Sequence, residues 1–235
     1  MGIGHSLYAL YQMGRFVVPT VLDSKRGPID RARLDQRIRA RARSIVDGAG
    51  IRLEVQGGEK VRTDRACVYM SNHQSHLDIP VLFCALPPVT MRAVAKKELF
   101  RVPLFGTAMR AAGVVEVDRA DRERAIASLQ GAAAAIADGV SMWIAPEGTR
   151  SRTGELGRLK KGGFHLAIDT GAPIVPVAIS GTRRALPAGG RSIRTGMPVR
   201  VVIGAPIETT GRDLQSLMDE VESFLAAHVD PDLSS

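Results

Sequence analysis

Cysteine and aromatic residues are scarce in this 235-residue sequence, and their scarcity excludes several classes of protein. The two cysteines, Cys67 and Cys84, cannot supply a disulfide framework or a cysteine-rich zinc site. Both lie in apolar runs, which is typical of reduced, buried thiols in a cytosolic protein. The glycine-rich loops that bind nucleotide phosphates are also missing, so a nucleotide-binding fold is not indicated. A composition of 45% hydrophobic and 24% charged residues predicts a globular chain, long enough to bury a core unaided.

The sequence also lacks a hydrophobic run long enough to cross a membrane. Between residues 6 and 22 the only charged side chain is Arg15, and apolar residues recur at helical spacing, at Leu7, Leu10, Tyr11, Val17, Val18 and Val21. Arg15 and Pro19 interrupt this run and leave it short of the ~20 apolar residues that a spanning helix needs. A basic leader and a small-residue cleavage site are both lacking, so a signal peptide is not predicted.

Acidic residues are outnumbered, above all in one segment. Lys and Arg total 32 while Asp and Glu total 24, which gives a net charge of +8. Residues 25–43 carry a local net charge of +6, from Lys25, Arg26, Arg31, Arg33, Arg37, Arg39, Arg41 and Arg43 against Asp30 and Asp35. Such a basic patch binds a polyanion, either nucleic acid or the headgroups of anionic lipids.

The apolar helix that precedes this patch favours lipid. We expect residues 1–50 to form helices in the interface of a membrane, on its cytoplasmic side, which would make the protein peripheral or monotopic. The alternative is that the first helix packs on its own domain. A basic nucleic-acid-binding module without catalysis would bind DNA or RNA with a steep salt dependence. We expect no nucleic-acid partner, because aromatic residues are only 4% of the chain and none is interleaved with these basic residues.

After residue 50, short β-rich runs alternate with helical stretches. We expect strands at residues 51–55, 67–71, 91–95, 114–117, 141–145, 174–179 and 199–203. Helices are expected from Asp121 to a stop at Gly139, and from about Arg212 to Ala227. Near-continuous apolar strands between helices predict an α/β domain over residues 51–235, in which helices cover a largely buried sheet.

The densest polar cluster runs from Asn72 to Asp78, directly after an apolar strand. Ligands of open α/β sheets bind where strands end and helices begin. His73 and Asp78 can meet if His73 lies in the loop and Asp78 in the first helical turn, which Pro80 supports because proline is tolerated there. An aspartate bonded to one imidazole nitrogen fixes the tautomer, so His73 is a candidate general base toward a hydroxyl.

Three interpretations of this cluster compete with catalysis by His73. Ser75 and Asp78 match a helix capping box, which needs no catalysis. Ser75 as a nucleophile lacks the Gly-x-Ser-x-Gly turn that exposes such a serine. His73 and His76 as metal ligands lack a third ligand nearby, so no metal is predicted.

Cations follow three further strands. Lys96 closes one strand, Arg119 follows another, and a third is followed by the turn Pro146-Glu147-Gly148-Thr149-Arg150-Ser151, whose glycine and small residues expose backbone N–H groups. Alone, each cluster would be a solvated surface turn, but together they describe a site for a phosphate monoester. Glu147 would repel a phosphate, so we expect it to hold Arg119 or Arg150 in place or to accept a hydroxyl of glycerol.

In this order and spacing, the clusters resemble the motifs of the 1-acylglycerol-3-phosphate acyltransferase family of phospholipid and glycerolipid acyltransferases. The family's Asn-His-x-Ser-x-x-Asp motif is matched by Asn72, His73, Ser75 and Asp78. Its Gly…Arg strand is matched by Gly113 and Arg119, although Glu116 is an unusual polar residue there. Its Pro-Glu-Gly-Thr-Arg-Ser motif is matched by residues 146–151 and its Val-Pro-Val strand by residues 175–177. The resemblance covers roughly residues 50 to 205.

The resemblance implies the fold of glycerol-3-phosphate acyltransferases, a mixed sheet covered by helices, and a direct acyl transfer. His73, aligned by Asp78, would take the proton from the free sn-2 hydroxyl of lysophosphatidic acid as that oxygen attacks an acyl thioester, which gives phosphatidic acid without an acyl-enzyme. The donor is expected to be acyl-coenzyme A or acyl-acyl-carrier-protein, and no cofactor is expected. A thioester is already activated, so deprotonation and positioning supply much of the catalysis.

Matching to the family also assigns the remaining site residues. The phosphate and glycerol of the acceptor would bind Lys96, Arg119, Glu147, Gly148, Thr149 and Arg150, while the site would be shaped by Asn72, Ser75 and Pro176. Another lysolipid, such as a lyso-ornithine lipid or a lysophospholipid with a larger headgroup, is the alternative acceptor.

Overall fold

The computed structural model describes residues 2–118, 122–190, 192–230 and 233. Within these residues one sheet has the strand order β1-β7-β6-β2-β5-β3-β4. Its strands are β1 (Arg52–Gln56), β2 (Val68–Ser71), β3 (Met91–Lys96), β4 (Val115–Val117), β5 (Ser141–Ile144), β6 (Ile174–Ser180) and β7 (Pro198–Ile203). Neighbouring strands are parallel except for β6 and β7, which run antiparallel. The mixed sheet is therefore confirmed, and so are the seven predicted strands, to within one residue at each end.

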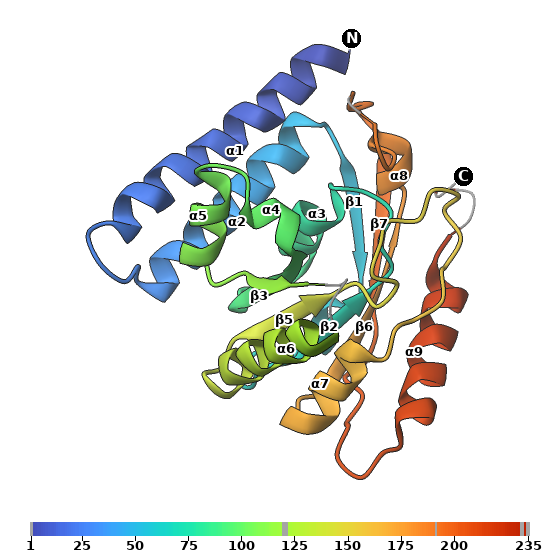
Figure 1. Ribbon diagram of the computed structural model, residues 1–235. Coiled ribbons are helices and arrows are strands. Elements are labelled where there is room, and N and C mark those ends of the chain that lie inside the picture. Colours follow the sequence, from blue (N-terminus) through green and yellow to red (C-terminus); the bar gives the residue numbers. More distant parts are fainter. Residues whose placement is uncertain (1, 119–121, 191, 231–232, 234–235) are drawn as a thin grey trace.

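Helices cover both faces of this sheet (Figure 1). One face packs against α6 (Arg122–Ala137), α7 (Gly162–Thr170) and α9 (Leu214–His228), and the other against α2 (Arg31–Gly48) and α3 (Asp78–Ala85). The central strand β2 is buried on both sides, because Met70 packs into the first of these cores and Tyr69 into the second. Burial on both faces explains why the central strands β2, β5 and β6 are near-continuous apolar runs.

The ends of two predicted helices follow local signals. The carboxylate of Asp213 accepts a hydrogen bond from the backbone N–H of Ser216 and so caps α9, which confirms the predicted C-terminal helix. Gly139, with a φ of +78°, follows the end of α6 as predicted. Asp121, the predicted N-terminal cap of that helix, lies outside the described residues.

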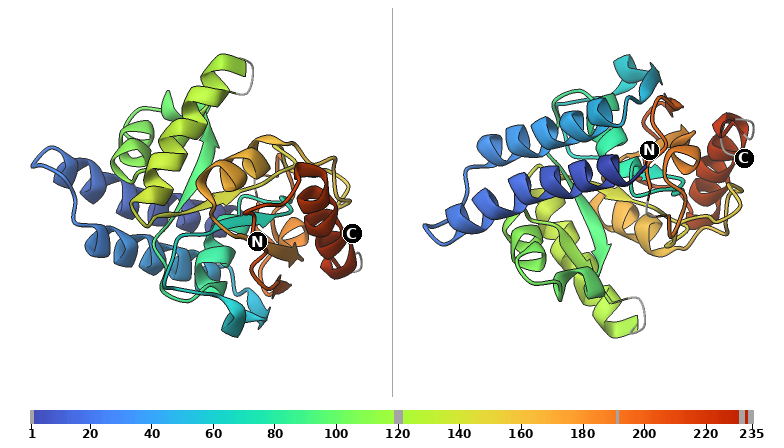
Figure 2. Two further views of the ribbon diagram at one scale, coloured as in Figure 1. Left: turned by 90° about the horizontal axis from the view of Figure 1, so that it is seen from below. Right: turned by 90° about the horizontal axis from the view of Figure 1, so that it is seen from above.

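The N-terminal helix α1 (Gly2–Ser24) and α2 form an antiparallel pair on the side of the molecule away from α9 (Figure 2). Pro19 lies inside α1 and does not end it. One face of α1 packs through Val17 and Val21 on α5 (Phe105–Ala111). Another face of the helix exposes Tyr8, Tyr11, Val18 and Leu22, which are 37%, 60%, 52% and 50% accessible to solvent. Among the described residues, no helix is long and apolar enough to span a bilayer.

Several arginines of the basic segment form hydrogen bonds within the protein. The guanidinium of Arg37 donates to the Asp23 carboxylate at 2.6 Å, and that of Arg41 donates to the Gln12 side chain at 2.9 Å. Arg39 donates to four backbone carbonyls at and after the C-terminal end of α3, those of Phe83, Leu86, Pro87 and Val89. The prediction of a single polyanion-binding patch is therefore wrong for these three cations, because arginines spaced along one helix point to several of its faces. The remaining five, Lys25, Arg26, Arg31, Arg33 and Arg43, are exposed.

Candidate functional site

The loop between β2 and α3 is held at its start by Asn72. The side-chain amide of Asn72 donates to the carbonyl of Ile179 and accepts from the N–H of the same residue, both at 2.8 Å. These two bonds continue the pairing of β2 with β6 by one residue past the end of β2. Pro80 then lies in the first turn of α3, where a missing N–H costs nothing. His73 is therefore placed in the loop at the carboxyl end of the central strands.

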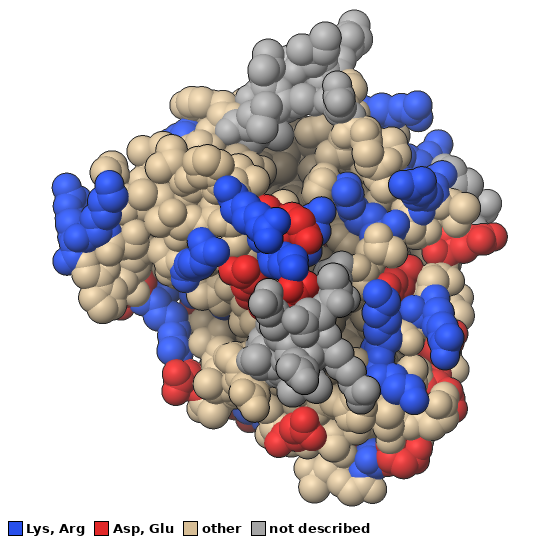
Figure 3. Space-filling view, viewed as in Figure 1, with Lys and Arg blue, Asp and Glu red and all other residues tan. Residues whose placement is uncertain are grey.

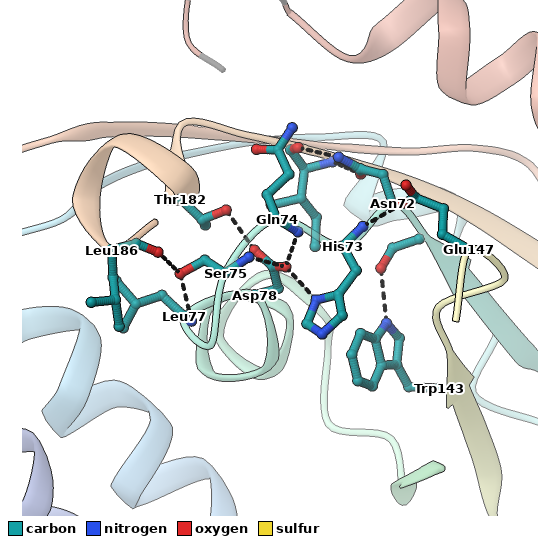
Figure 4. Close-up of polar contacts among 12 residues, drawn as sticks. Asn72, His73, Gln74, Ser75, Leu77, Asp78, Trp143, Glu147, Thr182 and Leu186 are labelled. Carbon is teal, nitrogen blue, oxygen red and sulfur yellow. Dashed lines mark hydrogen bonds and ion pairs between the residues drawn. The ribbon is translucent and has the colours of Figure 1, made fainter. Parts of the chain in front are cut away.

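His73 and Asp78 meet as the sequence predicts (Figure 4). The Nδ1 atom of His73 lies 2.7 Å from Oδ2 of Asp78, which is the first residue of α3. The Asp78 side chain is fully buried, whereas the His73 ring is 18% exposed. The ring also packs edge-on against Trp143, with 5.5 Å between the ring centroids. Within the described part of the chain no protein group bonds Nε2, so this nitrogen is available to a ligand.

Asp78 accepts four hydrogen bonds, although it is fully buried. Its Oδ2 atom accepts from His73 Nδ1 and from the backbone N–H groups of Gln74, at 2.7 Å, and Ser75, at 2.9 Å. Its Oδ1 atom accepts from the hydroxyl of Thr182. Hydrogen bonds to a carboxylate favour its charged form, so this environment suits an ionised aspartate.

Ser75 is buried and belongs to the framework of the loop. Its hydroxyl donates to the Leu186 carbonyl at 2.6 Å and accepts from the N–H of Leu77 at 3.1 Å. The capping-box interpretation is correct in part, because the Ser75 N–H bonds the Asp78 carboxylate, but that carboxylate also bonds His73. Among the described residues, no three His, Cys, Asp or Glu side chains are placed to share a metal ion.

Glu147 joins two loops beneath the site. One carboxylate oxygen accepts from the backbone N–H of His73 and the other from that of Gly157, both at 2.8 Å. The side chain is only 6% exposed, and burial raises its pKa. We expected Glu147 to hold an arginine or to accept a hydroxyl, but both of its oxygens are engaged by the backbone. In the described residues it makes no ion pair with Arg150.

The turn after β5 lies directly beside His73. The N–H of Ser151 donates to the His73 carbonyl at 2.7 Å. Gly148 adopts a φ of +72°, and a Cβ there would lie 2.8 Å from the Lys160 ammonium, so Lys160 covers this turn. Thr149 is exposed and Arg150 is half-buried.

Lys96 and Arg150 act on the same histidine. The pKa of His76 is lowered, first by partial burial and then by the positive charge of Arg150, with a weaker contribution from Lys96. The two cations that follow β3 and β5 therefore share one electrostatic environment with the His73 loop. Figure 3 shows Lys and Arg side chains near the centre of the face that it presents, with acidic side chains among them. Arg119 lies outside the described residues.

Pro176 is a residue of the sheet, and Lys97 is the first residue after β3. Pro176 is buried in the middle of β6, opposite Met70 of β2, and its carbonyl accepts from the N–H of Gly204 at 2.9 Å. It therefore belongs to the sheet beneath the site. Lys97, which the sequence analysis did not select, forms an ion pair with Asp118 and so links the ends of β3 and β4.

Sequence reasoning also missed Thr182 and Trp143, which touch Asp78 and His73. Trp143 lies in an apolar run, and Thr182 precedes Arg183 and Arg184 in a polar stretch that by itself assigns it no partner. The only available signal was their position at or near the carboxyl end of a predicted strand.

Most residues of this site lie in a segment that matches one protein family. The Acyltransferase family profile matches residues 52–180. A chloroplastic 1-acyl-sn-glycerol-3-phosphate acyltransferase of Brassica napus is 38% identical over 174 residues, which are 74% of this chain and 49% of that protein. A human 1-acyl-sn-glycerol-3-phosphate acyltransferase alpha is 35% identical over 175 residues, 73% of this chain and 62% of that protein. The chain thus spans about half the length of the Brassica relative.

The same likeness is present in three dimensions. The crystal structure of the 1-acyl-sn-glycerophosphate acyltransferase PlsC from Thermotoga maritima superposes with a TM-score of 0.81 at 26% sequence identity. The superposition covers 96% of this chain and 93% of that one, so it includes the N-terminal helices as well as the sheet.

Proposed function

Because this chain belongs to the Acyltransferase family, we propose that it transfers a fatty acyl group from an acyl thioester to the sn-2 hydroxyl of lysophosphatidic acid, forming phosphatidic acid. The observation that carries the proposal is the 2.7 Å contact between His73 and Asp78, in a loop that also touches the turn bearing Arg150. The names of the Brassica, human and Thermotoga proteins, which refer to this acceptor, support the choice of substrate.

His73 acts as the general base in this reaction. With Nδ1–H donated to ionised Asp78, the Nε2 atom carries a lone pair on the exposed side of the ring. Nε2 takes the proton of the acceptor hydroxyl while the oxygen attacks the thioester carbonyl carbon. The imidazolium that forms is stabilised by the buried negative charge of Asp78, as in hydrolases that pair a histidine with an aspartate.

The second half of the transfer returns the proton. The tetrahedral intermediate collapses, the C–S bond breaks, and the imidazolium gives its proton to the departing thiolate. The products are an ester and a thiol, and His73 is neutral again. Ser75 is buried with its hydroxyl bonded to a backbone carbonyl, which argues against an acyl-serine intermediate.

The acceptor phosphate binds the cations at the carboxyl ends of β3, β4 and β5. Arg150 and Lys96 lie within electrostatic reach of the histidine loop, and Arg119 joins them by its match to the family motif. Guanidinium groups bind a phosphate monoester through two parallel hydrogen bonds, and Gly148 and Thr149 supply a turn with backbone N–H groups. Glu147 holds the backbone of His73 and Gly157, so its contribution to acceptor binding is indirect.

The acceptor reaches this site from the cytoplasmic surface of a membrane on which α1 lies. The exposed face of α1 bears Tyr11 and Leu22, and the loop before α5 adds Val102 and Leu104, which are 47% and 58% exposed. Leu104 also has a φ of 62°, an uncommon conformation for a residue other than glycine. Apolar side chains on a helix with basic neighbours are typical of interfacial binding, and the thioester donor arrives from solution.

A product assay tests the proposal. The purified protein is given lysophosphatidic acid, lysophosphatidylcholine or a lyso-ornithine lipid, each with acyl-coenzyme A or with acyl-acyl-carrier-protein, and the products are identified by mass spectrometry. We expect phosphatidic acid to form fastest, with at least one donor. His73→Ala is the control, because product that persists at the same rate with this variant does not come from the site.

Two outcomes of the assay would contradict the proposal. Faster acylation of the other lysolipids would keep the reaction and reject the acceptor. No acylation of any lysolipid, together with salt-sensitive binding of DNA or RNA, would favour a basic binding module instead.

A further inference from the structure

We propose that Thr182 is a positioning residue for the acyl transfer, whose hydroxyl fixes the carboxylate that orients His73. The inference rests on the proposed function, because it concerns the rate of that reaction. Thr182 lies two residues beyond the segment that the family profile matches. It belongs to the short helix α8 (Thr182–Ala185), which follows β6.

The geometry that carries the proposal is the division of donors on Asp78. Oδ2 accepts three N–H groups, from His73, Gln74 and Ser75. In the described residues, the donor at Oδ1 is the hydroxyl of Thr182. Thr182 and His73 approach the carboxylate from opposite sides (Figure 4). A carboxylate bonded at one oxygen can still rotate about that oxygen, so the bond at Oδ1 fixes the plane of the group and the direction in which it holds the imidazole.

The fold places Thr182 there through a turn that requires glycine. Gly181 has a φ of +93°, and a Cβ at this position would lie 2.2 Å from the carbonyl oxygen of Pro198. The chain therefore passes tightly against β7 before α8 begins. The other end of this segment is held by the bond from the Ser75 hydroxyl to the Leu186 carbonyl, at 2.6 Å. Residues 182–186 thus contact the His73–Asp78 loop at two points.

Because the hydrogen bond between Thr182 and Asp78 is buried, its loss should lower the rate of acyl transfer. Thr182 and Asp78 are both fully buried, so water cannot replace the hydroxyl if it is removed. An unsatisfied oxygen on a buried carboxylate is costly, and the carboxylate would shift to recover a partner. The imidazolium of His73 exists only during the reaction, so a misplaced counter-charge weakens the transition state and leaves substrate binding unchanged.

Thr182→Val, which keeps the shape of the side chain and removes the hydroxyl, tests this role. The lost hydrogen bond is one to a charged carboxylate, so we expect kcat to fall by roughly 10- to 100-fold. The KM for lysophosphatidic acid and for the thioester should each stay within about 2-fold, since neither substrate touches Thr182. Thr182→Ser restores the hydroxyl and should recover kcat to within about 3-fold of the original protein.

Thr209 provides a matched control. Its side chain is 1% exposed, and its hydroxyl donates to the carbonyls of Ala167 and Ala172, both at 3.2 Å. These partners lie in and just after α7, near the amino end of β6, whereas the histidine loop follows the carboxyl end of the neighbouring parallel strand β2. Thr209→Val therefore loses buried hydrogen bonds of the same kind, and we expect a lower Tm with an unchanged kcat.

Each outcome decides the proposal. An unchanged kcat for Thr182→Val, a failure of Thr182→Ser to recover it, or an equal loss in Thr209→Val would overturn it. If the valine variant does not fold, Thr182→Cys, a weak donor, is compared with Thr182→Ser, and equal kcat values for these two would also overturn it. Inactivity of the unmodified protein in the same assay would instead reject the proposed function.

Discussion

Replacing Asp78 by asparagine removes a charge and leaves most hydrogen bonds possible. Oδ2 faces three N–H donors, so the amide oxygen of asparagine must take this position. The amide nitrogen then faces Thr182, whose hydroxyl can turn and accept. In this orientation the proton stays on Nδ1 of His73, and the histidine keeps the tautomer that it needs.

The expected loss of activity follows from the missing charge. When His73 becomes an imidazolium, its positive charge lies about 4 Å from the carboxylate, and this attraction is worth about 4 kcal/mol at an effective dielectric constant of 20. That energy corresponds to a kcat lower by about 10³-fold. Stability should change less, by about 2 kcal/mol or below, because weaker hydrogen bonds are offset by the smaller cost of burying a neutral group.

The assay combines turnover with thermal unfolding. Asp35→Asn is the matched control, because Asp35 accepts from Arg92 and Thr90, both at 2.5 Å, in a contact between α2 and β3. We expect Asp35→Asn to lower Tm without lowering kcat, and Asp78→Asn to lower kcat with a smaller change in Tm. A kcat for Asp78→Asn within about 3-fold of the original would refute the reasoning, since the charge would then contribute almost nothing.

Three further predictions concern the headgroup, a buried acid and the membrane. Arg150→Ala should raise the KM for lysophosphatidic acid by roughly 10- to 100-fold and leave the KM for the thioester within about 2-fold, which steady-state kinetics with each substrate varied in turn will measure. Because burial raises the pKa of Glu147, the folded protein retains a proton that the unfolded chain releases. The free energy of unfolding, relative to Glu147→Gln, should therefore fall as pH rises from 4.5 through that raised pKa, as urea titrations at stepped pH will show. Leu104→Ser combined with Tyr11→Ser should lower binding to anionic vesicles at least ~10-fold in a sedimentation assay, whereas Val55→Ser, which also alters an exposed apolar residue, should not.

Each of these has a contrary result. A raised KM for the thioester alone would remove Arg150 from headgroup binding. Parallel stability curves for the original protein and Glu147→Gln would mean that Glu147 has the same pKa in both states. Equal losses of vesicle binding from Val55→Ser and from the α1 and loop substitutions would show that the surface is not specific.

The strands and the catalytic pair could be predicted from the sequence because the signals are local. Short β-rich runs locate the strands to within one residue, and in β2, β5 and β6 these runs are apolar because both faces of the strands are buried. His73 and Asp78 are five residues apart, and Pro80 limits where the helix can begin, so one loop geometry suffices to bring them together.

The remaining contacts depend on pairings that local patterns do not contain. Glu147 sits among cations in the sequence, but it bonds the backbone of His73, 74 positions away, and that of Gly157. Thr182 is 104 positions from Asp78, and the polar stretch in which it lies does not indicate this partner. Arg39 belongs to a run of like charges that suggests a solvated face, yet it caps the end of α3. In each case the partner is a backbone group or a single side chain brought close by the order of the strands.

Comparing the rate of phosphatidic acid formation by the original protein with that of His73→Ala is the most direct test of the whole account. A free imidazole nitrogen that accepts the acceptor's proton predicts product from the original protein and a kcat lower by roughly 10²- to 10⁴-fold in the variant, with an unchanged Tm. Equal kcat values for the two folded proteins would contradict it, because the proton would then leave by another route.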